Sequence, residues 1–310
     1  MHPRRPVAAV TIAQMQALTR LQLALLVPLT LAWGLNWPVM KLGVTGYPPL
    51  TFRAISIWLG VPVLGLALVA MKVPFRIPRK NWPELLWLGA TNMFVWHACI
   101  ILAVNALSSG RAAILGYSMP IFSAVLGALL FSTALSRRGW LGVSAATAGV
   151  ALLLWHEFTD LAGRPGYVAL ALFAACTWAL GTQLLRRTRI EVPTLTISFW
   201  MTTLTAAVMT VLALLFERPL HLPGSVTWGA IAYNAILIFG FAHAAWFYLA
   251  RGLPPIASSL SVMLIPVLGV FSGAVWLREP VHWQDWAAVV LMVVAIASVL
   301  WPARRAPAER

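Results

Sequence analysis

The chain has 310 residues, of which 61% are hydrophobic and 10% are charged, and its mean hydropathy is +0.84. Because soluble domains carry about 25% charged residues, this composition excludes a soluble enzyme and indicates a protein whose solvent is lipid. The net charge of +14 would suggest nucleic acid in a soluble protein. No basic helix or aromatic–basic platform accompanies it, so we expect no nucleic-acid partner and assign the excess to membrane orientation.

Apolar runs of membrane-spanning length, each about 20 residues, recur along the whole chain. The first twenty residues contain no sustained apolar core, so we expect no cleaved signal peptide. We predict an all-α integral membrane protein with ten transmembrane helices, at 21–42, 49–71, 83–106, 110–132, 138–155, 166–186, 193–216, 226–250, 256–277 and 284–301. Residues 1–20 and 302–310 would form short tails.

The basic residues predict the orientation of these helices. With both termini in the cytoplasm, 16 of the 22 Lys and Arg residues fall on the cytoplasmic side. Six fall outside, namely Lys41, Arg53, Arg111, Arg164, Arg218 and Arg278. Short loops rich in Lys and Arg stay in the cytoplasm, and an even number of crossings agrees with cytoplasmic N- and C-termini.

The sequence also contains an internal repeat. An offset of 146 residues aligns Pro120 with Pro266 and His97 with His243, and an offset of 145 aligns Trp33 with Trp178. The repeats cover 21–155 and 166–301, and because each holds five helices, the second copy is inverted. Inverted repeats place a binding site at their interface near the midplane and support alternating access. The competing interpretation is duplication without transport, which predicts no polar cavity there.

Prolines inside the predicted helices indicate where these helices bend. Pro120 and Pro266 each remove an intrahelical hydrogen bond, and their matched positions favour a pair of symmetric hinges. Ordinary kinked packing is the alternative, because proline is common in membrane helices.

Several stretches resemble a known family. These are AWGLNWPVMKLG with PPLTFRAISIW, ALSSGRAAILGYSMPIFSAVLGALL, TWALGTQLLRR, and GLPPIASSLSVMLIPVLGVFSGAVWLREP. In order and spacing they resemble the EamA-type carriers of the drug/metabolite transporter superfamily, and most of all the YddG-type exporters of aromatic amino acids. The resemblance implies a multi-pass protein of the bacterial inner membrane. One departure is Thr133, where the family often has a Glu; Glu279 in the second repeat matches, and we interpret it as a helix-end residue.

The membrane interior offers few groups for proton chemistry. All eight acidic residues fall at helix ends, in loops or in tails. The deep titratable groups are His97 and His243, each about 20 Å along its helix and, by our prediction, in opposite halves of the membrane. Either one could bind substrate, carry a proton or stay neutral with a carbonyl partner. Since neither has a second ligand at helical spacing, we expect no metal and no cofactor. Cys99 and Cys176 lie in apolar runs and are expected to be free thiols.

Aromatic and neutral polar residues at mid-depth predict the wall of a substrate cavity. The predicted set is Trp33, Asn36, Phe94, His97, Tyr117, Trp178, Gln183, Trp200, His243 and Trp246. Helix packing is the alternative for any single tryptophan. Lys41 is either a basic anchor that reaches the headgroups or a vestibule charge that attracts an anion, and Arg53 and Arg111 invite the same two interpretations.

Together these features predict a carrier, not an enzyme, that exports amino acids, including aromatic and other neutral ones, by facilitated alternating access. Its partners would be these small molecules and the lipid bilayer. The alternative is export of other metabolites or of cationic drugs, coupled to protons through a histidine. The chain has no Walker motif for ATP, no clustered carboxylates for an intramembrane enzyme and no deep lysine for a retinal Schiff base.

Overall fold

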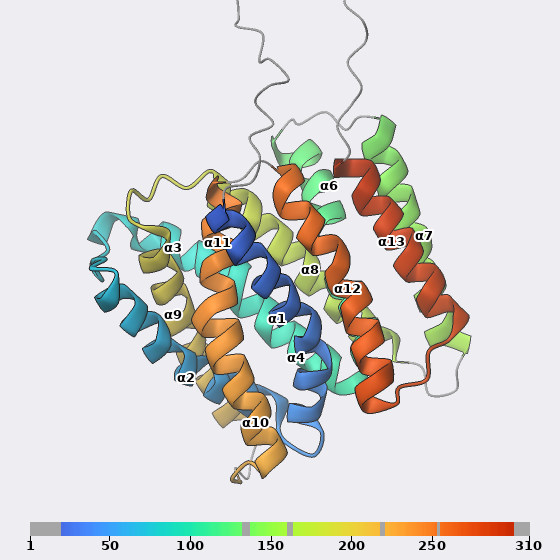
Figure 1. The fold of residues 1–310 in the computed structure, drawn as a ribbon, viewed down its shortest axis with the longest axis horizontal. Helices are drawn as coiled ribbons and strands as arrows, with labels where there is room; N and C mark the ends of the chain where they lie inside the picture. The colour runs from blue at the N-terminus through green and yellow to red at the C-terminus, as the bar shows by residue number, and fades with distance from the viewer. Residues whose placement is uncertain (1–19, 132–136, 160–163, 218–220, 253–254, 301–310) are drawn as a thin grey trace, which may run out of the picture.

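The computed structural model describes residues 20–131, 137–159, 164–217, 221–252 and 255–300, and within these ranges the regular structure is entirely helical (Figure 1). The first repeat forms α1 (Arg20–Val44), α2 (Pro49–Ala70), α3 (Trp82–Gly89), α4 (Val95–Ala106), α5 (Ser109–Gly116), α6 (Met119–Phe131) and α7 (Arg137–Thr159). The second forms α8 (Pro165–Arg186), α9 (Thr194–Phe216), α10 (Ser225–Tyr233), α11 (His243–Gly252), α12 (Pro255–Leu277) and α13 (Trp283–Leu300).

The helices coincide with the predicted spans to within a few residues. Six helical segments of the described chain are long and apolar enough to cross a membrane, which confirms an integral membrane protein. They are Pro49–Ala70, Arg79–Ala106, Ser109–Phe131, Pro165–Arg186, Thr194–Phe216 and Ser225–Arg251. The count of ten crossings and the cytoplasmic termini stay predictions, and most of both predicted tails lies outside the described residues.

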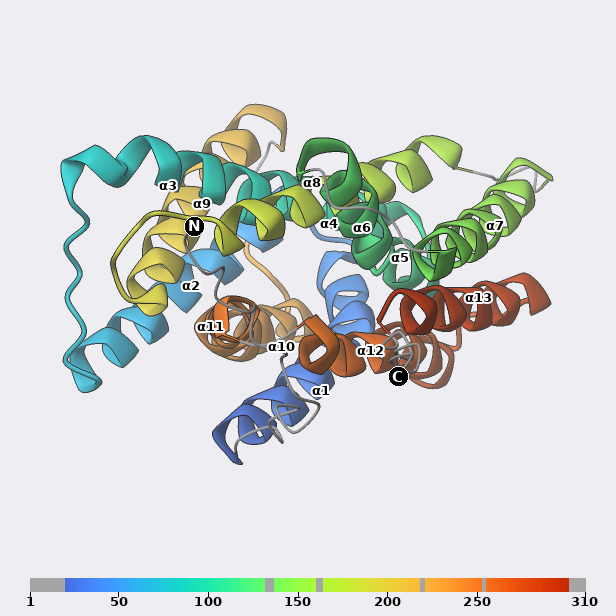
Figure 2. The same ribbon diagram turned by 90° about the horizontal axis from the view of Figure 1, so that it is seen from above.

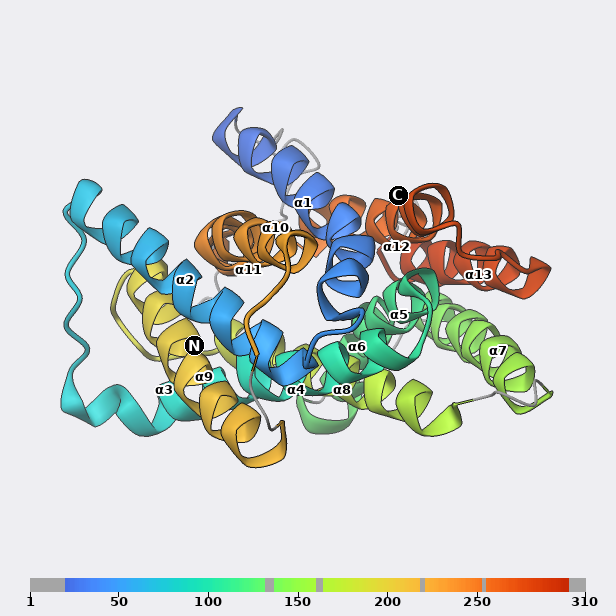
Figure 3. The same cartoon turned by 90° about the horizontal axis from the view of Figure 1, so that it is seen from below.

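The two repeats interleave, and they do not pack as two separate bundles. The three most extensive helix pairs join one repeat to the other, namely α7 with α13, α2 with α9, and α1 with α12, and α4 also packs against α8. Figures 2 and 3 show α7 and α13 side by side at one edge of the molecule and α2 and α9 side by side toward the other. The repeat is therefore a feature of the sequence, while each half completes its packing only against the other.

A π-helical stretch precedes each deep histidine. Segment η3 (Ala90–Phe94) joins α3 to α4, and η4 (Asn234–Ala242) joins α10 to α11. Residues 90–94 correspond to 236–240 under the offset of 146, so the two stretches occupy matched positions. π-helical stretches inside α-helices frequently lie at functional sites.

The two hinge prolines lie in different local structures. The helix predicted at 110–132 is interrupted at residues 117–118, and Pro120 is the second residue of α6, where no intrahelical N–H is needed. Pro266, in contrast, lies inside the continuous helix α12. The helix is thus interrupted beside Pro120 but continues through Pro266. Symmetric hinge motion stays a prediction.

We refer to the two ends of the bundle by the predicted topology. The predicted outer end holds the connections 45–48 and 107–108, and the predicted inner end holds 71–78 and 187–193. α1, α4, α8 and the α10–η4–α11 segment all pass through the middle of the molecule between these ends (Figure 1).

Candidate functional site

A cavity lies where the central helices of both repeats converge. About 430 Å³ of it is not filled by protein atoms, a figure that includes open space at its mouth, and the centre of a water molecule can occupy about 40 Å³. It is lined by Trp33, Asn36, Trp37, Met40, Arg53, Trp96, His97, Ile100, Tyr117, Met119, Trp178, Ile238 and His243. A water needs about 10–15 Å³ by the second measure, so in this conformation the cavity has room for a few waters.

His97 and His243 meet in this cavity. Their Nε2 atoms are 3.2 Å apart, and both side chains are buried. The prediction that they lie in opposite membrane halves is therefore wrong. Each histidine lies 18 residues, about 27 Å, from the start of its segment, Arg79–Ala106 or Ser225–Arg251, so position along the helix alone does not give the depth at which the two side chains meet.

The hydrogen bonds around the histidine pair assign the tautomers of the neutral rings. Nδ1 of His243 lies 2.8 Å from the carbonyl oxygen of Ile238, which accepts only, so this nitrogen carries the proton. Nε2 of His243 is then an acceptor, and Nε2 of His97 donates to it. This leaves Nδ1 of His97 as a buried lone pair without a partner in the described structure.

Residues related by the repeat meet across the pseudo-two-fold axis. The ring centroids of Trp33 and Trp178 are 6.2 Å apart, and those of His97 and His243 are 5.0 Å apart. A residue contacts its own repeat equivalent only where both lie near the axis that relates the repeats. Trp246 extends this aromatic cluster, because its ring lies 5.5 Å from that of Trp33.

The structure brings six of the ten predicted cavity residues to the cavity wall and places four elsewhere. The six are Trp33, Asn36, His97, Tyr117, Trp178 and His243. Trp246 lies behind Trp33, and Phe94 packs against the core from η3. Gln183 donates to the backbone and side-chain oxygens of Ser123.

Trp200 lies away from the cavity, close to the predicted inner end. Its Nε1 donates to the carbonyl oxygen of Phe75 at 2.7 Å, and its ring lies 5.2 Å from that of Trp82. Trp200 is only six residues, about 9 Å, from the start of α9, which explains why it does not reach the middle of the bundle.

Lys41 lies at the predicted outer end of α1 and does not line the cavity. Its Nζ donates to the carbonyl oxygens of Val104, Asn105 and Leu107 at 3.1, 2.9 and 2.8 Å. These groups end α4, where the helix leaves carbonyls unsatisfied and where a positive charge is favourable. All three ammonium protons are thereby directed to backbone.

Arg53 is the one charged side chain among the described cavity residues that the predicted set omits. It lies four residues into α2, where an anchor to the headgroups would be ordinary, yet it is only 1% exposed and lines the cavity. Trp37 and Trp96 are also omitted. Trp37 lies one helical turn after Trp33, so helical periodicity along α1 would have found it.

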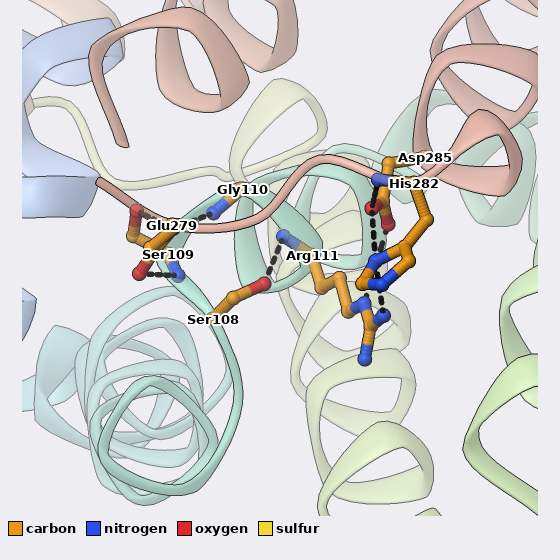
Figure 4. A network of polar contacts seen from close by, with 7 residues as sticks. All are labelled: Ser108, Ser109, Gly110, Arg111, Glu279, His282 and Asp285. Carbon is orange, nitrogen blue, oxygen red and sulfur yellow. Dashed lines mark hydrogen bonds and ion pairs between the residues drawn. The ribbon is translucent and has the colours of Figure 1, made fainter. Parts of the chain in front are cut away.

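Carboxylates at the predicted outer end bind helix N-termini. Glu279 accepts from Ser109 N at 2.8 Å, Ser109 Oγ at 2.7 Å and Gly110 N at 3.4 Å, at the start of α5 (Figure 4). Glu217 accepts from the backbone N–H groups of Leu50 and Thr51 at 2.8 and 2.7 Å, at the start of α2. Each contact joins one repeat to the other.

An ion pair lies next to Glu279. Nε of Arg111 is 3.2 Å from a carboxylate oxygen of Asp285, and the other oxygen accepts from the backbone N–H of His282 at 2.9 Å (Figure 4). This pair joins α5 to α13. Among the described residues no carboxylate lines the cavity, and the thiols of Cys99 and Cys176 are free, as predicted.

Comparison with known proteins agrees with this architecture. The model of the EamA-like transporter family matches residues 21–155 and 166–301. The chain is 25% identical to the uncharacterized inner membrane transporter YedA of Escherichia coli K12, over 89% of this chain and 91% of that protein. It is 26% identical to a probable amino-acid metabolite efflux pump of Salmonella typhimurium, over 88% and 92% of the two chains.

A solved crystal structure has the same fold, with a TM-score of 0.70 at 23% identity, covering 92% of this chain and 99% of that one. With the six apolar helices, these matches make the chain a multi-pass protein of the inner membrane.

Proposed function

Because the chain belongs to the EamA-like transporter family, we propose that it exports amino acids, aromatic and other neutral ones among them, by alternating access. The observation that carries the proposal is the cavity at the repeat interface, where Trp33 meets Trp178 and His97 meets His243. Inverted repeats built around such a site exchange roles when one end closes and the other opens.

The composition of the cavity wall supports amino acids as cargo. Trp33, Trp96 and Trp178 offer aromatic faces, while Asn36 and the histidine pair offer neutral hydrogen-bonding groups. Such a wall suits a molecule that is apolar at one end and zwitterionic at the other. The name of the Salmonella relative and the resemblance to YddG-type exporters support the same class.

The size of the cavity agrees with an alternating mechanism. In this conformation it has room for a few water molecules, which is less than a whole amino acid needs. An amino acid therefore enters only when helices or cavity side chains move apart.

The absence of a carboxylate from the described cavity wall favours facilitated export down the cargo gradient. Asp and Glu are the groups that most often carry protons or sodium in transporters. The alternative is proton coupling through the unpaired Nδ1 of His97, which is the one free lone pair of the histidine pair.

Flux through purified protein in liposomes tests the proposal. We expect release of tryptophan from loaded liposomes, reduced at least about tenfold by Trp178→Ala and unchanged by Trp228→Ala at an exposed position. No flux of any amino acid, with the protein folded and inserted, would exclude amino acids as cargo.

The same liposomes separate the alternatives. A flux that follows an imposed pH gradient and loses that response in His97→Gln would establish proton coupling. Preferred flux of a cationic drug over tryptophan would establish the drug exporter.

A further inference from the structure

We propose that Arg53 binds the carboxylate group of the transported molecule. The inference rests on the proposed function in one respect, that the central cavity is where cargo binds. It adds a chemical requirement that neither the family nor the fold supplies, namely that the cargo carries a carboxylate.

The guanidinium of Arg53 is held by neutral groups at the cavity wall. Arg53 projects from the first turns of α2 to the cavity wall and is fully buried. Its Nη1 donates to Oδ1 of Asn234 at 3.1 Å, and its Nη2 lies 2.7 Å from the sulfur of Met40. The guanidinium carbon is 5.6 Å from the ring centroid of Phe239 and 5.9 Å from that of Phe52.

The positive charge of Arg53 lacks a counterion among the described residues. All of these partners are neutral, and Arg53 forms no ion pair in the part of the chain that the structure describes. The carboxylates of Glu217 and Glu279 bind the N-termini of α2 and α5. Guanidinium keeps its proton in proteins, and a buried charge without a counterion is costly. A charge retained at this depth in a membrane protein is most simply explained by an anion that arrives with the cargo.

Two N–H groups of Arg53, at Nε and Nη2, remain for a ligand. Nε of Arg53 is buried without a partner, and beside it on the same edge is Nη2, whose one contact is the thioether of Met40. Two parallel N–H groups on one edge of a guanidinium match the two oxygens of a carboxylate. Thioether sulfur is a weak acceptor on a flexible side chain, so a carboxylate would displace it readily.

A neutral acceptor in the same cavity wall, on Asn36, suits the amino group of the cargo. Oδ1 of Asn36 is also buried without a partner, and it lies one helical turn from Met40 along α1. It can accept from an ammonium, while Trp33 and Trp178 lie beside it in the wall. The cavity thus offers one cationic group for an anion and one neutral oxygen for a cation. An amine without a carboxylate would leave Arg53 unpaired and would meet its positive charge.

Calorimetric binding to the purified full-length protein in detergent tests this arrangement with four probes. They are tryptophan, indole-3-propionate, tryptamine and tryptophan amide, which share the ring and differ in their charged groups. A paired bidentate contact predicts that wild type binds the two carboxylates at least about tenfold more tightly than the two amines. Arg53→Gln should abolish this preference, and Arg53→Lys should keep part of it because it keeps the charge.

Arg189→Gln is the matched control, because it removes one arginine charge at an exposed position outside the cavity and should leave all four affinities unchanged. The wild-type comparison of carboxylates with amines needs no variant, so it decides the question even if Arg53→Gln fails to fold. Equal affinity for carboxylates and amines, binding of none of the four probes, or an unchanged preference in Arg53→Gln overturns the inference.

The outcomes also separate this inference from the proposed function. Arg53-dependent binding of indole-3-propionate without binding of any amino acid retains the carboxylate site and removes amino acids as cargo. Amino-acid flux with full carboxylate preference in Arg53→Gln retains the transporter and removes the role of Arg53.

Discussion

The contact between Glu279 and the start of α5 predicts how firmly the two repeats are joined at the predicted outer end. In Glu279→Gln the side chain keeps its shape, but it loses its negative charge and exchanges one acceptor oxygen for an NH2 donor. The wild-type carboxylate accepts three hydrogen bonds from Ser109 and Gly110. At least one of these is lost in the variant, and the others become bonds to a neutral group.

The magnitude follows from these contacts. A hydrogen bond to a charged group contributes about 1.5–3 kcal/mol, and a negative charge at a helix N-terminus adds about 0.3–1 kcal/mol. We expect Glu279→Gln to destabilise the contact with the start of α5 by about 2 kcal/mol. This corresponds to roughly a 30-fold change in the equilibrium between the formed and the broken contact.

Hydrogen exchange at the backbone amides of Ser109 and Gly110, followed by mass spectrometry in detergent or nanodiscs, measures this opening directly. These amides should exchange roughly 30-fold faster in Glu279→Gln. Glu191→Gln, the same change at an exposed residue, is the control and should leave their exchange unchanged. Exchange within twofold of wild type in Glu279→Gln would refute the reasoning.

Three further predictions test other contacts. Gly181→Ala would place a methyl group 2.8 Å from a backbone nitrogen of η3, whereas the methyl group of Gly229→Ala would meet no atom within 4 Å. Because overpacking costs about 1–3 kcal/mol, Gly181→Ala should have a melting temperature at least about 2 °C below that of Gly229→Ala. Equal melting temperatures would contradict this. Lys41→Met should melt below wild type while binding tryptophan equally well, and weaker binding would instead make Lys41 a vestibule charge. Nitrogen NMR of labelled histidines should show His243 protonated at Nδ1 and His97 at Nε2, and the reverse pattern would exclude the assigned tautomers.

The helices and the repeat could be predicted because apolar length and residue spacing are properties of the sequence itself. The meeting of His97 with His243 could not, because the depth of a side chain depends on segment length, helix tilt and the π turns before each histidine. The sequence leaves two interpretations of Arg53, an anchor to the headgroups or a vestibule charge, for a similar reason. A basic residue one turn into a helix is compatible with either an anchor or a buried charge, and only the neighbouring helices decide between them.

The glutamate caps at the predicted outer end have no carboxylate counterpart at the positions that the sequence repeat relates to them. Glu217 and Glu279 each fasten one repeat to the other at the predicted outer end. The positions 145 or 146 residues earlier are Met71 or Lys72 and Thr133, none of which carries a carboxylate. At the predicted inner end a different carboxylate joins the repeats, because Glu84 accepts from Thr188 Oγ at 2.6 Å and from the backbone N–H of Arg189 at 3.1 Å. The two predicted ends are therefore held by residues that the repeat does not relate to each other, so under the alternating access proposed above the two closures need not have equal energies.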